Sequence, residues 1–114
     1  MNVSFHSIED VVVLTLDGSA DIKNAPKLDS VCKKISESKA NNILIDCTKL
    51  EYISSVCLRV LLTLSKEIKK NKGRLAVAHA NALVQKIFEI SGFVELFPFY
   101  DSVVTALNSF QNKG

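Results

Sequence analysis

The stretch ILIDCTKLEYISSVCLRVLLTLSKEIKKNKGRLAVA, residues 43–78, decides the fold of this chain. It begins with the wholly apolar run Ile43–Ile45, continues through a helical pattern, and ends with a second short run, Leu75–Ala78. Short runs that are apolar throughout are typical of parallel strands buried on both faces of a sheet. A helix between two such strands forms a right-handed crossover. The stretch therefore predicts a βαβ unit within an α/β fold.

The helix of this unit is predicted by apolar residues that recur at helical spacing, namely Leu58, Leu61, Leu62, Leu64 and Ile68. Lys69 and Lys70 fall in its last turn, where cations complement the helix dipole. Gly73 is expected at the C′ position that ends the helix. The segment that precedes the helix, residues 46–53, is predicted to be a loop with apolar anchors.

Before this unit, two strands are predicted at Val3–Phe5 and Val11–Leu16, joined by a tight turn at Glu9 and Asp10. The first helix is expected to follow, with Asn24 as its N-cap and Pro26 in its first turn. Its inward face has the spacing i, i+3, i+4, i+7 and consists of Leu28, Val31, Cys32 and Ile35.

After the unit, Asn81 is expected to cap a third helix that Gly92 ends. Its predicted inward residues are Leu83, Val84, Ile87, Phe88 and Ile90. A short strand is expected at Leu96–Phe97. A last helix opens at Asp101 or Ser102 and is expected to bury Val103, Val104, Leu107 and Phe110.

The predicted order is therefore β-β-α-β-α-β-α-β-α, which gives a mixed, mostly parallel sheet of about five strands with about four helices. The first two strands form an antiparallel hairpin at its edge. Because no Pro/Ser-rich linker or repeat interrupts the sequence, residues 1–114 are expected to form a single domain.

Composition excludes several classes of function. The net charge is +2 with no basic half, which argues against nucleic acid as a partner. The longest apolar run, Val11–Leu16, is too short to cross a membrane, and residues 1–10 do not resemble a signal peptide. Three cysteines without paired spacing indicate reduced thiols. We therefore expect a cytoplasmic protein without membrane contact.

Motifs for catalysis or cofactor binding are largely missing from the sequence. There is no Gly-rich phosphate loop and no Gly-x-Ser-x-Gly motif. His6 and His79 have no Cys or carboxylate at ligand spacing, so no metal site and no cofactor are expected. Asp17, Asp21 and Asp46 could gather at the strand ends and bind a cation, but turn and cap roles are favoured.

One segment, Tyr52–Leu61, combines several signals. Ser54 sits where a loop becomes a helix and can cap it, which leaves Ser55 without a capping role. A phosphate on Ser55 would meet the free N–H groups and the positive end of the helix dipole. Cys57, within the first helical turn, is either a thiol with a lowered pKa or a small buried apolar residue, and the second interpretation is favoured.

Five segments resemble a known family when they are taken in this order: Val11–Leu16 with Gly18–Asp21, Asn42–Asp46, Tyr52–Leu61, Phe88–Phe93 and Phe99–Leu107. The family is that of the STAS-domain anti-sigma factor antagonists, small bacterial proteins that act in partner switching. The segment Tyr52–Leu61 resembles the family signature aromatic-Ile-Asp-Ser-Ser/Thr/Ala-Gly-Leu-x-x-Leu. The resemblance spans nearly the whole chain and implies a binding protein that regulates transcription, in these relatives often in a stress response, and not an enzyme.

In that family a kinase-type anti-sigma factor binds the antagonist and can phosphorylate the serine that follows the signature Asp, and a serine phosphatase reverses the reaction. The resemblance therefore implies that Ser55 is the phosphoacceptor and that phosphorylation there releases the partner. It implies a partner-binding surface made of Asp21, Ser54, Ser55, Val56, Cys57 and Arg59.

The sequence departs from the signature at two positions. Ser54 stands where the family has Asp, and either residue offers an oxygen to cap the helix. Cys57 stands where the family has Gly, so its side chain is expected to project onto the surface that the partner approaches.

Two alternatives remain open. The first is a phosphorylation-independent STAS scaffold or ligand-binding module in a stress-signalling or transport-regulating assembly. The second, a small enzyme with Ser55 or Cys57 as nucleophile, is disfavoured because no base lies at a diagnostic position. The oligomeric state is also open, although the edge strand Val3–Phe5 could pair with another strand.

Overall fold

The computed structural model describes residues 1–92 and 97–111, and within them the chain forms one five-stranded sheet of order β1-β2-β3-β4-β5. Its strands are β1 (Asn2–Ile8), β2 (Val11–Ala20), β3 (Asn42–Ile53), β4 (Arg74–Ala78) and β5 (Phe99–Tyr100). β1 pairs with β2 in antiparallel fashion, and the remaining neighbours are parallel. The predicted mixed sheet with an N-terminal hairpin is confirmed.

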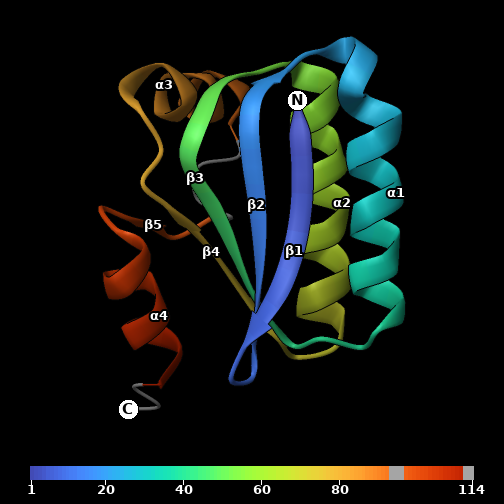
Figure 1. Ribbon diagram of the computed structural model, residues 1–114, viewed down its shortest axis with the longest axis vertical. Helices are drawn as coiled ribbons and strands as arrows, with labels where there is room; N and C mark the ends of the chain where they lie inside the picture. The colour runs from blue at the N-terminus through green and yellow to red at the C-terminus, as the bar shows by residue number, and fades with distance from the viewer. Residues whose placement is uncertain (93–96, 112–114) are drawn as a thin grey trace.

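Four α-helices flank this sheet within the described residues: α1 (Ala25–Glu37), α2 (Ser55–Lys70), α3 (Ala82–Ser91) and α4 (Val103–Gln111). A short 3-10 helix, η1 (Ile22–Asn24), precedes α1. Figure 1 shows α1 and α2 side by side on one face of the sheet, α4 on the other, and α3 near the upper end. None of the described helices combines the length and apolarity that crossing a bilayer requires.

The two faces of the sheet have cores of very different size. The larger core lies between the sheet and helices α1 and α2, and it includes Leu14, Leu28, Ile45 and Leu58, all at most 1% exposed. The smaller core lies under α4 and consists of Val11, Val13, Leu44, Ala76, Ala78, Ala106 and Phe110. Both faces of the central strand β3 are therefore covered, as the apolar run Ile43–Ile45 predicted.

The prediction of a loop at residues 46–53 is wrong, because β3 continues to Ile53. Its second half pairs with the end of β2, as in Ala20 opposite Ile53, but the register shifts twice along β2. These irregularities replace the period-two alternation by buried residues at every third position, namely Cys47, Leu50 and Ile53. Without that alternation, the sequence pattern of a strand is lost.

The predicted strand at Leu96–Phe97 is also misplaced. Leu96 lies outside the described residues, Phe97 lies in a bend, and β5 begins only after Pro98. The Pro98 carbonyl accepts a hydrogen bond from the Val77 N–H at 2.8 Å, which starts the pairing with β4. Phe97 instead serves as a core residue at 1% exposure and meets the Phe88 ring edge to face at 5.2 Å.

Three apolar residues that were expected to face inward are exposed: Leu83 at 52%, Ile90 at 74% and Val104 at 68%. α3 covers only the end of the sheet, so a narrow stripe of Val84 and Phe88 suffices to pack it. α4 likewise buries only Ala106 and Phe110 fully. Both helices lie at the margin of a core, so part of their apolar side chains stays exposed to solvent.

The end of α2 differs from its prediction by one residue. Lys72, not Gly73, occupies the left-handed position, with φ of 63°. The N–H groups of Lys72 and Gly73 donate to the carbonyls of Lys69 and Ile68, at 2.9 and 2.8 Å, which is the Schellman arrangement. Gly73 is required for a different reason, because a Cβ there would lie 2.1 Å from the Asn41 carbonyl oxygen.

We expect the Gly73→Ala substitution to lower the free energy of unfolding by about 1–3 kcal/mol, since the added methyl group collides with the Asn41 carbonyl just before β3. Urea denaturation measures the change. Lys72→Gly is the matched control at the neighbouring position. Lys72 itself has the left-handed backbone conformation, which glycine adopts without steric cost, so this substitution should be neutral or stabilising by up to about 1 kcal/mol. A Gly73→Ala protein as stable as the wild type would contradict this packing.

Candidate functional site

The junction between β3 and α2 is built around Ser54. Its extended backbone places the side chain at the N-cap of α2, where Oγ accepts a hydrogen bond from the Cys57 N–H at 3.2 Å. Its own N–H donates to the Ala20 carbonyl at the end of β2, at 2.8 Å. Ser54 therefore caps the helix, as predicted, and joins two neighbouring strand ends.

Ser55 is the first residue of α2 and is exposed. The N–H groups of this first turn have no partner within the helix, and the turn contains no acidic residue. A negative charge on Ser55 would meet these amides and the positive end of the dipole. Arg59, exposed one turn later, lies on the same side of the helix as Ser55.

The prediction that Cys57 projects onto the surface is wrong. Its side chain is 0% exposed and points into the larger core. The thiol donates to the Asp21 carbonyl at 3.2 Å, so it attaches the loop after β2 to the first turn of α2. Glycine at this position would leave that loop without the contact. The side chain itself cannot touch a partner.

Asp21 is held from its other side by Asn24. The Asn24 side-chain amide donates to the Asp21 carboxylate at 2.8 Å and to the Ser19 carbonyl at 3.0 Å. The prediction that the Asn24 side chain caps α1 is wrong, because that position has helical backbone angles and makes no side-chain cap bond. The amide instead fixes the loop that presents Asp21 beside α2.

The structure thus brings five predicted site residues to one edge of the sheet, the carboxyl ends of β2 and β3, at the top of Figure 1. We call this edge the Ser55 surface, and it consists of Asp21, Ser54, Ser55, Val56 and Arg59, with Cys57 buried beneath. Asp21 and Ser54 are half-buried, and the other three surface residues are exposed.

Large apolar side chains are also exposed near this edge of the sheet, and Ile22 among them was not singled out from the sequence. Ile22 in η1 is 65% exposed, Tyr52 at the end of β3 is 41% exposed, and Leu83 in the first turn of α3 is 52% exposed. Val56 adds a fourth at 38%. A lone isoleucine within the polar segment Ser19–Lys23 is the signal that would have identified Ile22. Exposed apolar side chains rimmed by polar residues are typical of a protein-binding surface.

Other groups considered for chemistry have structural roles instead. The Asp46 carboxylate accepts from the Thr48 N–H and hydroxyl, at 3.0 and 2.6 Å, within β3 where its register against β2 shifts. The described residues contain no group of side chains that could hold a metal ion. Burial, reinforced by Asp46, raises the pKa of Cys47 to about 12, so that thiol stays protonated at neutral pH.

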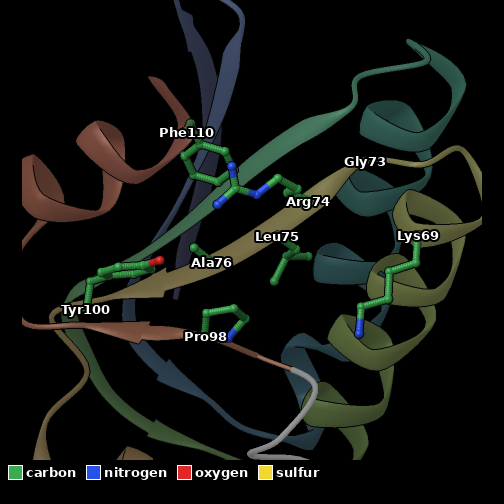
Figure 2. A pocket seen from close by; sticks show the side chains of 8 residues that line it. All are labelled: Lys69, Gly73, Arg74, Leu75, Ala76, Pro98, Tyr100 and Phe110. Atoms are coloured by element: carbon green, nitrogen blue, oxygen red, sulfur yellow. The ribbon is translucent and has the colours of Figure 1, made fainter. Parts of the chain in front are cut away.

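A small pocket of about 190 Å³ lies at the amino end of β4, away from the Ser55 surface (Figure 2). The Arg74 guanidinium lies over the Phe110 ring at 5.4 Å and donates to the Ser109 carbonyl at 3.1 Å. Arg74 thereby attaches α4 to the sheet. Arg74, the last of four cations within residues 69–74, therefore has a structural role.

Comparison with known proteins adds the family. The STAS domain matches residues 2–106 of this sequence. The chain belongs to the STAS family. STAS proteins related to this one are regulatory binding proteins and not enzymes. This finding argues against the alternative of a small enzyme with Ser55 or Cys57 as its nucleophile.

Three relatives show how far the similarity extends. BtrV of Bordetella bronchiseptica, which bears the name of an anti-sigma factor antagonist, is 29% identical over 111 residues, 97% of this chain and 96% of its own. A Thermotoga maritima protein with the same designation has a crystal structure with a TM-score of 0.89 at 22% identity, covering 96% and 95% of the two chains. The structure of the Bacillus protein SpoIIAA in its phosphorylated form has a TM-score of 0.74 at 16% sequence identity. The match covers 96% of this chain and 99% of that one.

The two serines of the junction should differ sharply in their effect on stability. Ser54→Ala removes the N-cap of α2 and is expected to lower the free energy of unfolding by about 1 kcal/mol. Ser55→Ala, the matched control one residue later, removes an exposed hydroxyl and should stay within about 0.5 kcal/mol of wild type. Urea denaturation distinguishes them, and equal losses would contradict the assignment of Ser54 as the cap.

Proposed function

We propose that this STAS protein is an anti-sigma factor antagonist that binds an anti-sigma factor through the Ser55 surface and is released when that partner, acting as a serine kinase, phosphorylates Ser55. A serine phosphatase would restore the binding form. The observation that carries the proposal is the exposure of Ser55 at the first position of α2, directly after a residue that already caps the helix.

The fold can accept the modification without rearrangement. A phosphate on Ser55 replaces no buried contact, because the residue is exposed. It would carry about −1.5 to −2 charges at neutral pH, beside the unpaired amides of the first turn and one turn from Arg59. The free protein should therefore keep its structure and its stability in both states.

The same charge would be costly within a complex. The exposed apolar side chains Ile22, Tyr52 and Val56, on η1, the end of β3 and the start of α2, favour close, dry contact with a protein partner. Enclosing a phosphate there removes its water, at a cost of several kcal/mol unless cations of the partner meet it. Turning a complex from nearly all bound to nearly all free takes about 5.5 kcal/mol, which one phosphate can supply.

The two departures from the family signature are compatible with this role. Ser54 supplies the cap that the signature Asp would supply. Cys57 directs its side chain into the core, so the surface around Ser55 is free of it. The partner would then meet the hydroxyl of Ser55, the loop acid Asp21 and the exposed residues beside them.

The names of the similar proteins support the proposed role of an anti-sigma factor antagonist. BtrV and the Thermotoga maritima protein bear the name of anti-sigma factor antagonists, and SpoIIAA has been solved both phosphorylated and unphosphorylated. By this proposal, residues 1–114 form one STAS domain that acts in the bacterial cytoplasm on a transcriptional response to stress.

Phosphate on Ser55 is the first expected outcome. Mass spectrometry of the protein isolated from its own cells, both growing and starved, should find a phosphopeptide containing Ser55 whose occupancy changes between the two conditions. The Ser55→Ala protein, expressed in the same cells, should lack it. A Ser55 without phosphate in every condition would contradict the switch and favour the phosphorylation-independent scaffold.

Binding should respond to charge at Ser55 alone. We expect Ser55→Asp to weaken binding to the cognate anti-sigma factor at least tenfold in titration calorimetry, which corresponds to about 1.4 kcal/mol, with thermal unfolding unchanged. Ser30→Asp places the same charge on an exposed serine of α1 and serves as the matched control. Equal affinity of Ser55→Asp and wild type would refute the proposed mechanism.

A further inference from the structure

β1 presents an open edge. It is the first strand in the sheet order and pairs only with β2 among the described residues. Its seven residues pair with β2 without any register shift, whereas the pairing of β2 with β3 is irregular at two places. β1 therefore lies at one edge of the sheet (Figure 1), and one row of its backbone N–H and C=O groups has no partner strand among the described residues.

The edge lacks the usual protection against pairing. Natural edge strands carry lysine, proline or a bulge that prevents a second strand from binding. The β1 sequence NVSFHSI contains no residue of these kinds and no Asp, Glu or Arg. Phe5 and Ile8 are instead 42% and 38% exposed. An exposed strand without Lys, Arg, Asp or Glu favours pairing with a second strand of the same kind.

The hairpin register determines which backbone groups point outward. Residues 9 and 10 form a two-residue turn, with Glu9 at a positive φ of 55°, and Ile8 stands opposite Val11. In such a hairpin the pair beside the turn exchanges its hydrogen bonds, and every second pair does the same. The groups of Val3, Phe5 and Ser7 therefore point away from β2, toward solvent.

We propose that β1 binds β1 of a second copy of this chain in antiparallel orientation, with Phe5 opposite Phe5 of the partner subunit. In this register Val3 lies opposite the partner's Ser7, so every outward group of one strand meets an outward group of the other. The contact is symmetric about a two-fold axis and forms about six backbone hydrogen bonds.

The side chains fit the same register. Phe5 stands opposite Leu14, whose side chain lies in the larger core. Both Phe5 rings therefore come together on the face of the sheet that α1 and α2 cover. Aromatic pairs directly opposite each other stabilise a sheet. On the other face, Ser4 meets the partner's His6. No like charges oppose each other within the paired strands.

The dimer leaves the Ser55 surface free. That surface lies at the carboxyl ends of β2 and β3, whereas the contact runs along β1. Because the two-fold axis reverses the strand direction, the two Ser55 surfaces would face opposite ways from one continuous ten-stranded sheet. Two partner proteins could then be bound at once. The proposal stands or falls independently of phosphorylation.

The dimer should be weak. A contact of seven residues per strand buries less than the roughly 1,000 Å² that stable association requires. We therefore expect a dissociation constant of the dimer in the range of tens to hundreds of micromolar. Sedimentation equilibrium of the full chain between about 10 and 1,000 μM should show a shift from monomer to dimer.

Charge at the two-fold axis tests the register. Phe5→Lys and Phe5→Glu each place like charges directly opposite each other, so each variant alone should remain monomeric at every concentration. An equimolar mixture of the two places opposite charges together and should restore dimers. Ile22→Lys, which adds a charge at an exposed apolar site away from β1, is the control and should dimerise like the wild type. Circular dichroism verifies that the variants fold.

Three results would overturn the proposal: a wild-type protein that stays monomeric up to 1,000 μM, a dimer that Phe5→Lys leaves intact, or dimerisation lost in Ile22→Lys. Failure of the mixture to dimerise would exclude the register with Phe5 at the axis. Ser7→Pro offers a second variant, since it removes one outward N–H and leaves the β2 side unchanged, and it should also weaken the dimer.

Discussion

The hydrogen bond from the Ser54 N–H to the Ala20 carbonyl is the contact on which the functional end of the molecule depends. It joins the ends of two parallel strands at the residue where one of them becomes a helix. From there, the Ser54 hydroxyl caps α2 and the Cys57 thiol holds the loop of Asp21. Together these three bonds place a carboxylate, a hydroxyl and a helix N-terminus in a fixed arrangement.

This arrangement separates stability from regulation. Ser54 and Cys57 are engaged in contacts that hold the fold, whereas the Ser55 side chain is exposed. A modification at Ser55 can therefore change the charge of the surface while the backbone beneath stays in place. In the proposed mechanism, such rigidity lets the partner respond to the added charge alone.

Several elements could be predicted from the sequence because their patterns are local. The apolar run Ile43–Ile45, the helical spacing in α2 and the caps Ser54 and Asn81 all behave as predicted. The predictions failed where distant contacts decide. β3 extends to Ile53 only because the end of β2 lies beside it, and Leu83 is exposed only because α3 meets the edge of the core.

By itself, the sequence determined the order of strands and helices, the crossover from β3 through α2 to β4, and the position of Ser55 at the start of a helix. These features could be predicted because periodicity and capping act over a few residues. Only the tertiary structure decided that Cys57 points inward to the Asp21 carbonyl, that Asn24 holds that loop, and that Ile22, next to Asp21 in the chain, stands exposed. The direction of a side chain depends on which segments fold against it, and that neighbourhood is set by residues far away along the chain.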